Sequence, residues 1–151
     1  MLARLSRQIE SPPTWLILAI VLAAMQRAWL PVWPTGRGFD MIGAVLVLAG
    51  IALLIAAALR FRQARTTILP REAPARLITG GVYRFSRNPI YLADTLILSG
   101  LILRWDLGSL PLVAGFVAII TQRFIRGEEA GCAAAFGADW HAYAARVRRW
   151  I

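Results

Sequence analysis

The stretch G-G-V-Y-R-F-S-R-N-P-I-Y, residues 80–91, lies between two apolar halves of the chain and combines turn residues, arginines and a helix start. Asn88 followed by Pro89 predicts that a helix begins here, because Asn can cap free amides and Pro suits the first helical position. The free amides of such a helix end, with Arg84 and Arg87 one turn upstream, form a site for a carboxylate or a phosphate. The alternative is that both arginines only mark a cytoplasmic membrane boundary.

The composition is that of a membrane protein. Of 151 residues, 58% are hydrophobic, which is too apolar for an ordinary soluble fold. The net charge of +9 comes from seventeen arginines against eight acids, and fourteen of these arginines lie in residues 4–7, 60–87 and 123–149. Arg37 and Arg104 lie in the other loops. The positive-inside rule explains this split if both termini lie in the cytoplasm. The charge therefore requires no nucleic-acid partner. A basic inner surface would also bind anionic membrane lipids.

Metal chemistry is not expected. The single Cys132 excludes an internal disulfide and a thiolate metal cluster, and the single His141 excludes a paired-histidine site. We interpret Cys132 as a small buried residue and His141 as a surface residue. Arg4 and Arg7 ahead of an apolar run imitate a secretory signal, but the run continues far enough to favour an uncleaved first span.

Four apolar segments predict four membrane-spanning helices. They cover residues 15 to about 32, 41–59, 90–103 and 109–125. In the second segment, Gly43 and Gly50 favour close helix packing. The third segment has only fourteen residues, which at ~1.5 Å each reach about 21 Å and fall short of a ~30 Å apolar core. We therefore expect this helix to begin below the membrane surface or to be shielded by protein.

The segments outside the spans complete an all-α integral membrane fold. Residues 60–88 are polar and punctuated by proline and glycine, which predicts an irregular cytoplasmic segment laid against the membrane face. Near the C-terminus, Gly137 suits a helix end and Asp139 the next N-cap. The last helix places four apolar residues on one side, which predicts an amphipathic helix lying in the membrane interface. These residues are Trp140, Tyr143, Val147 and Trp150.

We expect one membrane domain over residues 1–151. Two N-terminal spans occupy residues 1–59, and residues 60–151 hold the cytoplasmic loop, a helical hairpin and the C-terminal helices.

Two adjacent acids follow the fourth span and reach the level of residues 84–88. Glu128 and Glu129 would accept hydrogen bonds from ribose hydroxyls or an α-amino group while the cationic helix start holds a carboxylate, which together fit an amino-acid-bearing nucleoside. The alternative is that both acids form ordinary salt bridges with Arg123 or Arg126.

Asp94 is an acid inside a short apolar helix, one turn beyond Tyr91. An acid in such a place indicates function unless an arginine such as Arg27 or Arg123 neutralises it. Arg27 itself lies in the first span, where a side chain reaching the far interface explains it best.

Several pieces of the sequence resemble the isoprenylcysteine carboxyl methyltransferase and phospholipid methyltransferase superfamily of integral membrane methyltransferases. The family pattern is a G-x-Y-x-x-x-R-[HN]-P-x-Y block, an apolar hairpin, a Glu-Glu pair and an F-G-x-x-[YW]-x-x-Y tail. The resemblance covers roughly residues 66–151, through residues 67–70, 77–84, 86–91, 128–129, and 136–143. Asn88 stands where the eukaryotic members have histidine, although bacterial relatives look alike here. Ala93, Gly127 and Cys132 replace the usual Gly, Pro and Leu, and none of these departures removes a polar contact.

The resemblance implies a small helical enzyme that binds S-adenosylmethionine on the cytoplasmic side, between the arginine-proline block and the glutamates. It places cofactor contacts at Tyr83, Arg87, Asn88, Pro89, Tyr91, Glu128 and Glu129.

We therefore expect methyl transfer to a lipophilic acceptor in a bacterial inner membrane. The acceptor would be an isoprenoid or prenylcysteine carboxylate, a phospholipid amine or a small apolar thiol. Arg87 would orient a carboxylate, Asp94 would act as a base or cation anchor, and Glu129 would hold the cofactor or accept a proton. The alternatives are an NADPH-dependent sterol-type reductase, which would need more basic residues and usually more spans, and a four-span exporter, which would carry an acid in its first span.

Overall fold

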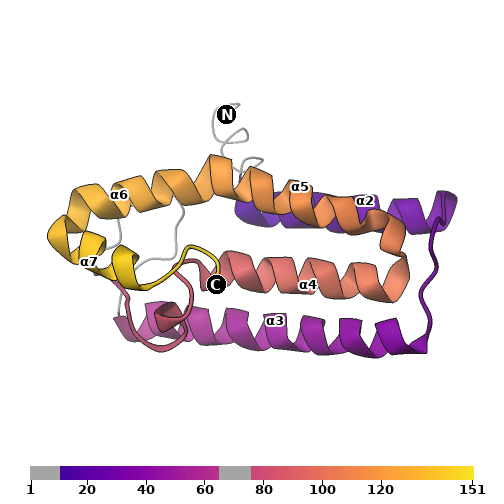
Figure 1. Ribbon diagram of the computed structural model, residues 1–151, viewed down its shortest axis with the longest axis horizontal. Helices are drawn as coiled ribbons and strands as arrows, with labels where there is room; N and C mark the ends of the chain where they lie inside the picture. The colour runs from indigo at the N-terminus through magenta and orange to yellow at the C-terminus, as the bar shows by residue number, and fades with distance from the viewer. Residues whose placement is uncertain (1–10, 65–75) are drawn as a thin grey trace.

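The computed structural model describes residues 11–64 and 76–151, so the predictions for Arg4, Arg7 and residues 67–70 lie outside the described residues. The described part is all-α, and its long helices lie side by side along one axis (Figure 1). They are α2 (Pro12–Trp29), α3 (Arg37–Ala64), α4 (Pro89–Trp105), and a continuous run of α5 (Leu110–Ile120), the π-helical turn η3 (Thr121–Ile125) and α6 (Arg126–Phe136). The remaining helical elements are the 3₁₀ turns η1 (Gly81–Arg84) and η2 (Leu107–Ser109) and the helix α7 (Ala138–Arg146).

Each predicted apolar segment lies largely in a helix. By length and composition, α3 and the run Leu107–Phe136 are long and apolar enough to cross a membrane. The third segment forms α4, which has 17 residues instead of the predicted fourteen because the helix begins at Pro89 and continues through Trp105. At ~1.5 Å per residue α4 reaches about 26 Å, still short of a ~30 Å apolar core. It packs against α2, α3 and α5, so protein shields it as expected.

Three glycines bring α3 and α4 into close contact. A Cβ on Gly100 of α4 would lie 2.5 Å from the carbonyl oxygen of Gly43, and a Cβ on Gly50 would lie 2.8 Å from that of Ala93. Neither position can hold a larger residue without moving a backbone, which confirms the expected packing role of Gly43 and Gly50. On the other side of α4, Leu98 and Ile102 pack in the fully buried core with Ile120.

The helix α3 is longer than predicted at its C-terminal end. Residues 60–64 were expected to be irregular, but they continue the helix as far as Ala64. The reason lies in contacts with η1: the ring of Phe61 packs edge-on against Tyr83 at a centroid distance of 5.8 Å. Gly81 has φ +63 and sits so close to the side chain of Arg60 that a Cβ would clash with it. The extension of α3 therefore supports the turn that precedes α4.

At the opposite end of the bundle, Asp106 ties two loops together. Its carboxylate accepts hydrogen bonds from the backbone amides of Val32 (3.0 Å), Trp33 (3.1 Å) and Gly108 (2.7 Å). The amide of Gln26 donates to the same carboxylate at 3.3 Å, and the hydroxyl of Ser109 donates to Gln26 Oε1 at 2.7 Å. Asp106 is only 1% exposed. It therefore joins the α2–α3 loop to the α4–α5 turn.

The C-terminal region differs from the prediction in two respects. Gly137, with φ +49, ends α6 and also precedes α7, so Asp139 lies in the first turn of α7 and is not its N-cap. The helix α7 ends at Arg146, which leaves Val147 and Trp150 outside it. Trp140 and Tyr143 are buried against the rest of the protein. The prediction of one amphipathic helix with all four of these apolar residues on a membrane-facing side is therefore wrong, because the chain turns back after Arg146 to contact the start of α4.

Candidate functional site

The start of α4 lies where the sequence predicts it, with Asn88 at the N-cap position and Pro89 as the first helical residue. The side chain of Asn88 does not cap the helix, however. Its Nδ2 donates to the carbonyl of Arg149 at 3.0 Å, and its backbone amide donates to Ser86 Oγ at 3.1 Å. The predicted capping bond is thus replaced by a bond to the C-terminal segment. Arg84 is exposed, so only Arg87 of the two predicted arginines belongs to the cluster described below.

The two glutamates of α6 face different partners. Glu128 Oε1 accepts a hydrogen bond of 2.7 Å from the hydroxyl of Tyr91, although the two residues are 37 positions apart. Glu129 contacts arginines instead, and these are Arg87 and Arg149 and not the neighbouring Arg123 or Arg126. The guanidinium of Arg123 lies over the ring of Trp15, 5.5 Å from its centroid. The alternative of local salt bridges is therefore not what the structure contains.

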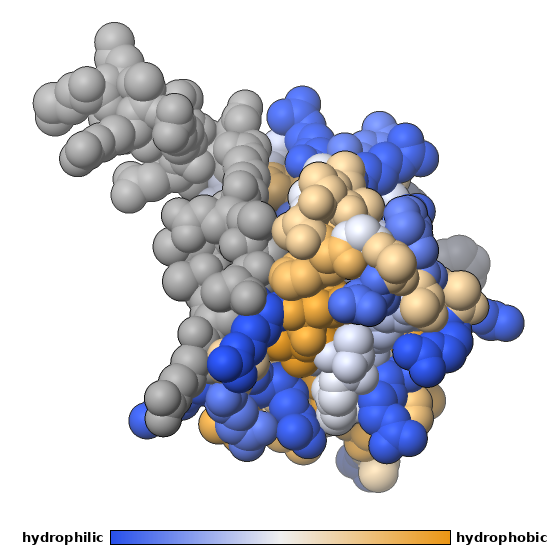
Figure 2. All heavy atoms as spheres, turned by 90° about the vertical axis from the view of Figure 1, so that its left-hand side faces the viewer, coloured by the Kyte–Doolittle hydropathy of each residue, from blue (hydrophilic) through white to orange (hydrophobic). Residues whose placement is uncertain are grey.

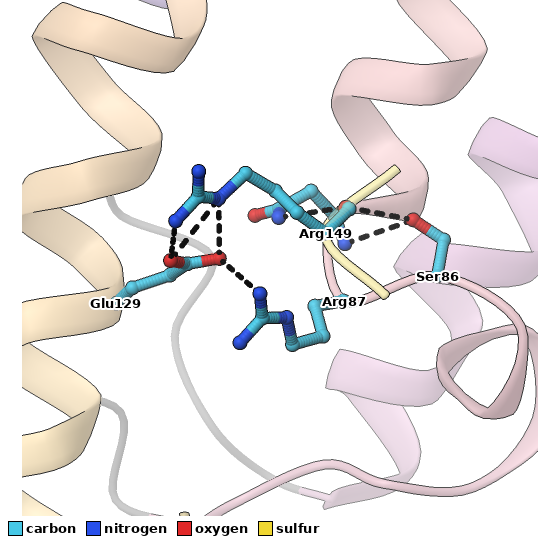
Figure 3. Close-up of polar contacts among 5 residues, drawn as sticks. Ser86, Arg87, Glu129 and Arg149 are labelled. Atoms are coloured by element: carbon cyan, nitrogen blue, oxygen red, sulfur yellow. Dashed lines mark hydrogen bonds and ion pairs between the residues drawn. The ribbon is translucent and has the colours of Figure 1, made fainter. Parts of the chain in front are cut away.

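Glu129 lies between two arginines that come from distant parts of the chain (Figure 3). Arg149 Nη2 is 2.6 Å from Oε2, and Arg149 Nε donates to both carboxylate oxygens at 3.0 and 3.2 Å. Arg87 Nη2 is 3.4 Å from Oε1. The side chains of Glu129 and Arg87 are 13% and 15% exposed, so water screens these charges only in part.

The segment after α7 closes this cluster from the C-terminal side. The amide of Arg87 donates to the carbonyl of Arg148 at 3.0 Å, and Ser86 Oγ donates to the carbonyl of Arg149 at 3.3 Å. Together with the bond from Asn88, these contacts hold the last residues of the chain against the start of α4. Nothing in the sequence singles out Arg149, because it is one of several arginines near the C-terminus and its partners are distant in sequence.

Two tyrosines support the turn before α4. Tyr143 of α7 donates a hydrogen bond of 2.7 Å to the backbone carbonyl of Tyr83. Burial raises the pKa of Tyr143 to about 12 and also raises the pKa of Tyr83, so both phenols stay protonated at neutral pH. The guanidinium of Arg87 lies 5.6 Å from the ring centroid of Trp140, within the range of a cation–π contact. The helix α7 therefore positions both the turn and Arg87.

Asp94 is 7% exposed and lies one turn beyond Tyr91 on α4. Neither arginine that was considered as its structural partner pairs with it: Arg27 is exposed, and Arg123 contacts Trp15. Among residues 11–64 and 76–151 its carboxylate forms no hydrogen bond or ion pair, and the neighbouring Thr95 hydroxyl bonds only to its own helix.

The structure thus brings most of the predicted site residues to one end of the bundle. The sequence model of the phospholipid methyltransferase family matches residues 39–139, about two thirds of the chain. The chain belongs to that family. The phospholipid methyltransferase family implies that the protein is a methyltransferase with a lipid-related substrate, and the two apolar helices fit its association with a membrane. No curated protein and no solved structure matches the chain significantly.

The family match includes every predicted site residue, because Tyr83 and Glu129 are the first and last of them. It stops at Asp139, before Trp140, Tyr143 and Arg149. In this phospholipid methyltransferase family member, the residues that close the Glu129 cluster from the C-terminal side therefore lie beyond the matched region.

Proposed function

We propose that the protein transfers a methyl group from S-adenosylmethionine to a lipophilic acceptor at the cytoplasmic face of a membrane. The observation that carries this proposal is the meeting of the start of α4 with the glutamates of α6, which places Arg87 beside Glu129 and Tyr91 beside Glu128. Carboxylates and a guanidinium at one place match a ligand that carries an ammonium, ribose hydroxyls and a carboxylate.

The donors and acceptors of the cluster fit this cofactor. Glu128 and Glu129 are acceptors for hydroxyl or ammonium groups, whereas the Nε of Arg87 is buried with no hydrogen-bond partner among the described residues. A buried donor without a partner is costly, and an anionic group of a ligand would satisfy it. We assign cofactor contacts to Tyr83, Arg87, Asn88, Pro89, Tyr91, Glu128 and Glu129.

S-adenosylmethionine supplies a methyl group that its sulfonium already activates. The tasks left to the protein are to hold the acceptor in line at ~3 to 3.5 Å and to exclude water. Arg87 and Glu129 would hold charged groups in fixed positions, since each is already fixed by other contacts of the cluster.

We also propose four membrane spans, with α2 and α4 crossing beside α3 and the run α5 to α6. Both termini and the Glu129 cluster would face the cytoplasm, as the arginine distribution indicates. Figure 2, which views the molecule from the end where α7 lies, shows a band of hydrophobic residues between hydrophilic ones. An apolar surface reaching this end supports a lipophilic acceptor. We propose that the membrane is a bacterial inner membrane.

Membrane-impermeant maleimide labelling tests this topology. In a Cys132→Ala background, single cysteines replace Gly36 and Ala138, which are both exposed at opposite ends of the bundle. We expect only the cysteine at 36 to be labelled from outside intact cells. Labelling at 138 from outside would show that the topology is inverted and that the Glu129 cluster does not face the cytosolic cofactor.

Asp94 suggests the chemistry of the acceptor. A carboxylate that no described residue neutralises would attract the cation of an amine acceptor or accept its proton, whereas it would repel a carboxylate acceptor. We therefore favour a lipid amine over an isoprenoid carboxylate, with Arg87, Asp94 and Glu129 as the candidate catalytic residues.

Isothermal titration of the detergent-solubilised protein tests the proposed function against its alternatives. We expect S-adenosylhomocysteine to bind and NADPH not to bind. Binding of NADPH alone would favour a sterol-type reductase, and binding of neither ligand would favour a protein without this enzymatic activity, such as an exporter.

A further inference from the structure

Arg149 is held through both its main chain and its side chain, and yet its side chain is the most exposed of the cluster. Its main-chain carbonyl is fixed by Asn88 and Ser86 at the start of α4. Its side chain grips Glu129 through Nε and Nη2. The side chain of Arg149 is 36% exposed, against 13% for that of Glu129, so a ligand from the cytoplasm would reach Arg149 first.

Two arginines around one carboxylate leave donors unused. A guanidinium carries five N–H groups, and Glu129 occupies only those of Nε and Nη2 on Arg149. No residue of 11–64 or 76–151 accepts a hydrogen bond from Nη1 of Arg149, and Nε of Arg87 is buried without a partner. Both arginines point toward the same carboxylate (Figure 3). The site therefore has an excess of cationic donors over acceptors.

We propose that Arg149, together with Arg87, binds the α-carboxylate of the cofactor's amino-acid part while Glu129 binds its α-ammonium group. This inference rests on the proposed function. A zwitterionic group entering between the three side chains gives each charge an opposite partner, because the carboxylate takes the free donors and the ammonium shares Glu129. Arg149 would then be a cofactor-binding residue, contributed by a segment that the family match does not reach.

The competing explanation is that Arg149 only ties the C-terminal segment to α6. The two explanations differ in what they predict for a ligand that lacks the carboxylate. If Arg149 only ties the segment, its removal should change the affinity for all ligands of the site alike. If Arg149 binds the carboxylate, its removal should weaken only ligands that carry the carboxylate.

Isothermal titration with two ligands separates these explanations. The ligands are S-adenosylhomocysteine and its decarboxylated analogue, which keeps the ammonium group. We expect Arg149→Ala to weaken S-adenosylhomocysteine about tenfold or more, since a charge-assisted contact is lost, and to change the affinity of the decarboxylated analogue by less than about twofold. Arg149→Lys keeps the charge but not the planar fork of donors. Its affinity for S-adenosylhomocysteine should therefore lie between those of Arg149→Ala and the unmodified protein.

Arg146→Ala is the matched control. Arg146 is exposed on α7, its guanidinium bonds only to the carbonyl of Ala142 in its own helix, and its loss should change neither affinity. Equal losses of both ligands in Arg149→Ala, or no loss of either, would overturn the inference while leaving S-adenosylhomocysteine binding by the unmodified protein intact. Failure of the unmodified protein to bind S-adenosylhomocysteine would overturn the proposed function and this inference together.

Discussion

The two ends of the helix bundle each hold a carboxylate of low exposure, but different kinds of donor hold it. Asp106 accepts hydrogen bonds from the backbone amides of Val32, Trp33 and Gly108. Glu129 is held by the side chains of Arg87 and Arg149. Backbone amides are neutral and fixed by the fold, so they suit a permanent tie between loops. Arginine side chains are long, charged and rich in donors, so they can exchange one anionic partner for another.

The contrast predicts that the end with Asp106 determines stability and the end with Glu129 determines ligand binding. Substitutions at each end should therefore separate into two classes by what they change.

The largest effect is expected at Asp94, a buried carboxylate with neither kind of donor. Asp94→Asn should lower turnover with an amine lipid by ~10²-fold, the low end of what one general base contributes, because the amide can neither accept the proton nor attract the cation. The affinity for S-adenosylhomocysteine should stay within a few-fold. Methyl-transfer assays and titrations on the same preparations measure both quantities.

Ser99→Ala is the control for that experiment, because Ser99 lies further along α4 and its hydroxyl bonds only to the carbonyl of Thr95. It should leave turnover unchanged. If Asp94→Asn lowers the thermal midpoint and leaves turnover per folded molecule intact, Asp94 is a structural residue and the preference for an amine acceptor is wrong.

A matched pair of charge removals tests the comparison itself. Glu129→Gln should weaken S-adenosylhomocysteine about tenfold or more, because it removes a charge-assisted contact worth ~1.5 to 3 kcal/mol. Asp106→Asn should leave that affinity unchanged and lower the thermal midpoint, since an amide cannot accept all the bonds that reach the buried carboxylate. Titration and thermal unfolding of both variants measure the two effects. Loss of ligand affinity in Asp106→Asn would show that the two ends are not independent.

The contact between α3 and α4 lies between the two ends and should affect stability alone. Gly100→Ala places a Cβ 2.5 Å from the carbonyl oxygen of Gly43, so the helices must separate, at a cost of ~1 to 3 kcal/mol. Gly115→Ala is the control, because a Cβ there meets no atom within 4 Å. Thermal unfolding in detergent compares them, and equal midpoints would mean that the close approach of α3 and α4 contributes nothing.

The smallest expected effect is a dependence of the stability on pH. Burial alone would raise the pKa of Asp106, but hydrogen bonds from Gly108, Trp33, Gln26 and Val32 outweigh it and lower the pKa below its ordinary value. A lowered pKa in the folded state means that the charged carboxylate stabilises the protein above the ordinary pKa of about 4, and that this contribution is lost as the pH falls through the folded value.

Unfolding measured as a function of pH should show this loss, and Asp106→Asn should remove it. Asp40→Asn is the control at the same end, because Asp40 is exposed and pairs only with the exposed Arg104 at 2.8 Å. If the pH dependence of stability survives Asp106→Asn, another titratable group causes it.

Local signals in the sequence predicted the helices and the start of the site. The apolar segments predicted the long helices, and Asn88-Pro89 predicted where α4 begins, because these features depend only on neighbouring residues. Gly43 and Gly50 predicted close packing correctly, but not that Gly43 would meet Gly100 and Gly50 would meet Ala93. That Glu129 lies at the level of Arg87 followed from placing both beyond the ends of apolar segments, but their ion pair was not predicted.

The features that sequence reasoning missed depend on distant contacts. Arg149 contacts Glu129 only because the chain turns back after α7, and the four apolar residues near the C-terminus suggested a longer helix instead. Asp106 is an ordinary loop acid in the sequence, and its role depends on amides 73 and 74 positions away. Residues 60–64 were predicted to be irregular because of their polarity, but the contact between Phe61 and Tyr83 keeps them helical.

Hydrogen exchange of backbone amides, measured with and without saturating S-adenosylhomocysteine, tests most directly that one end of the bundle binds the ligand and the other is a permanent tie. We predict slower exchange in residues 83–92 and 126–150 when the ligand is bound, and no change in residues 30–40 and 104–110. Protection confined to residues 30–40 and 104–110, or no protection at residues 83–92 and 126–150 while the ligand is bound, would contradict this account.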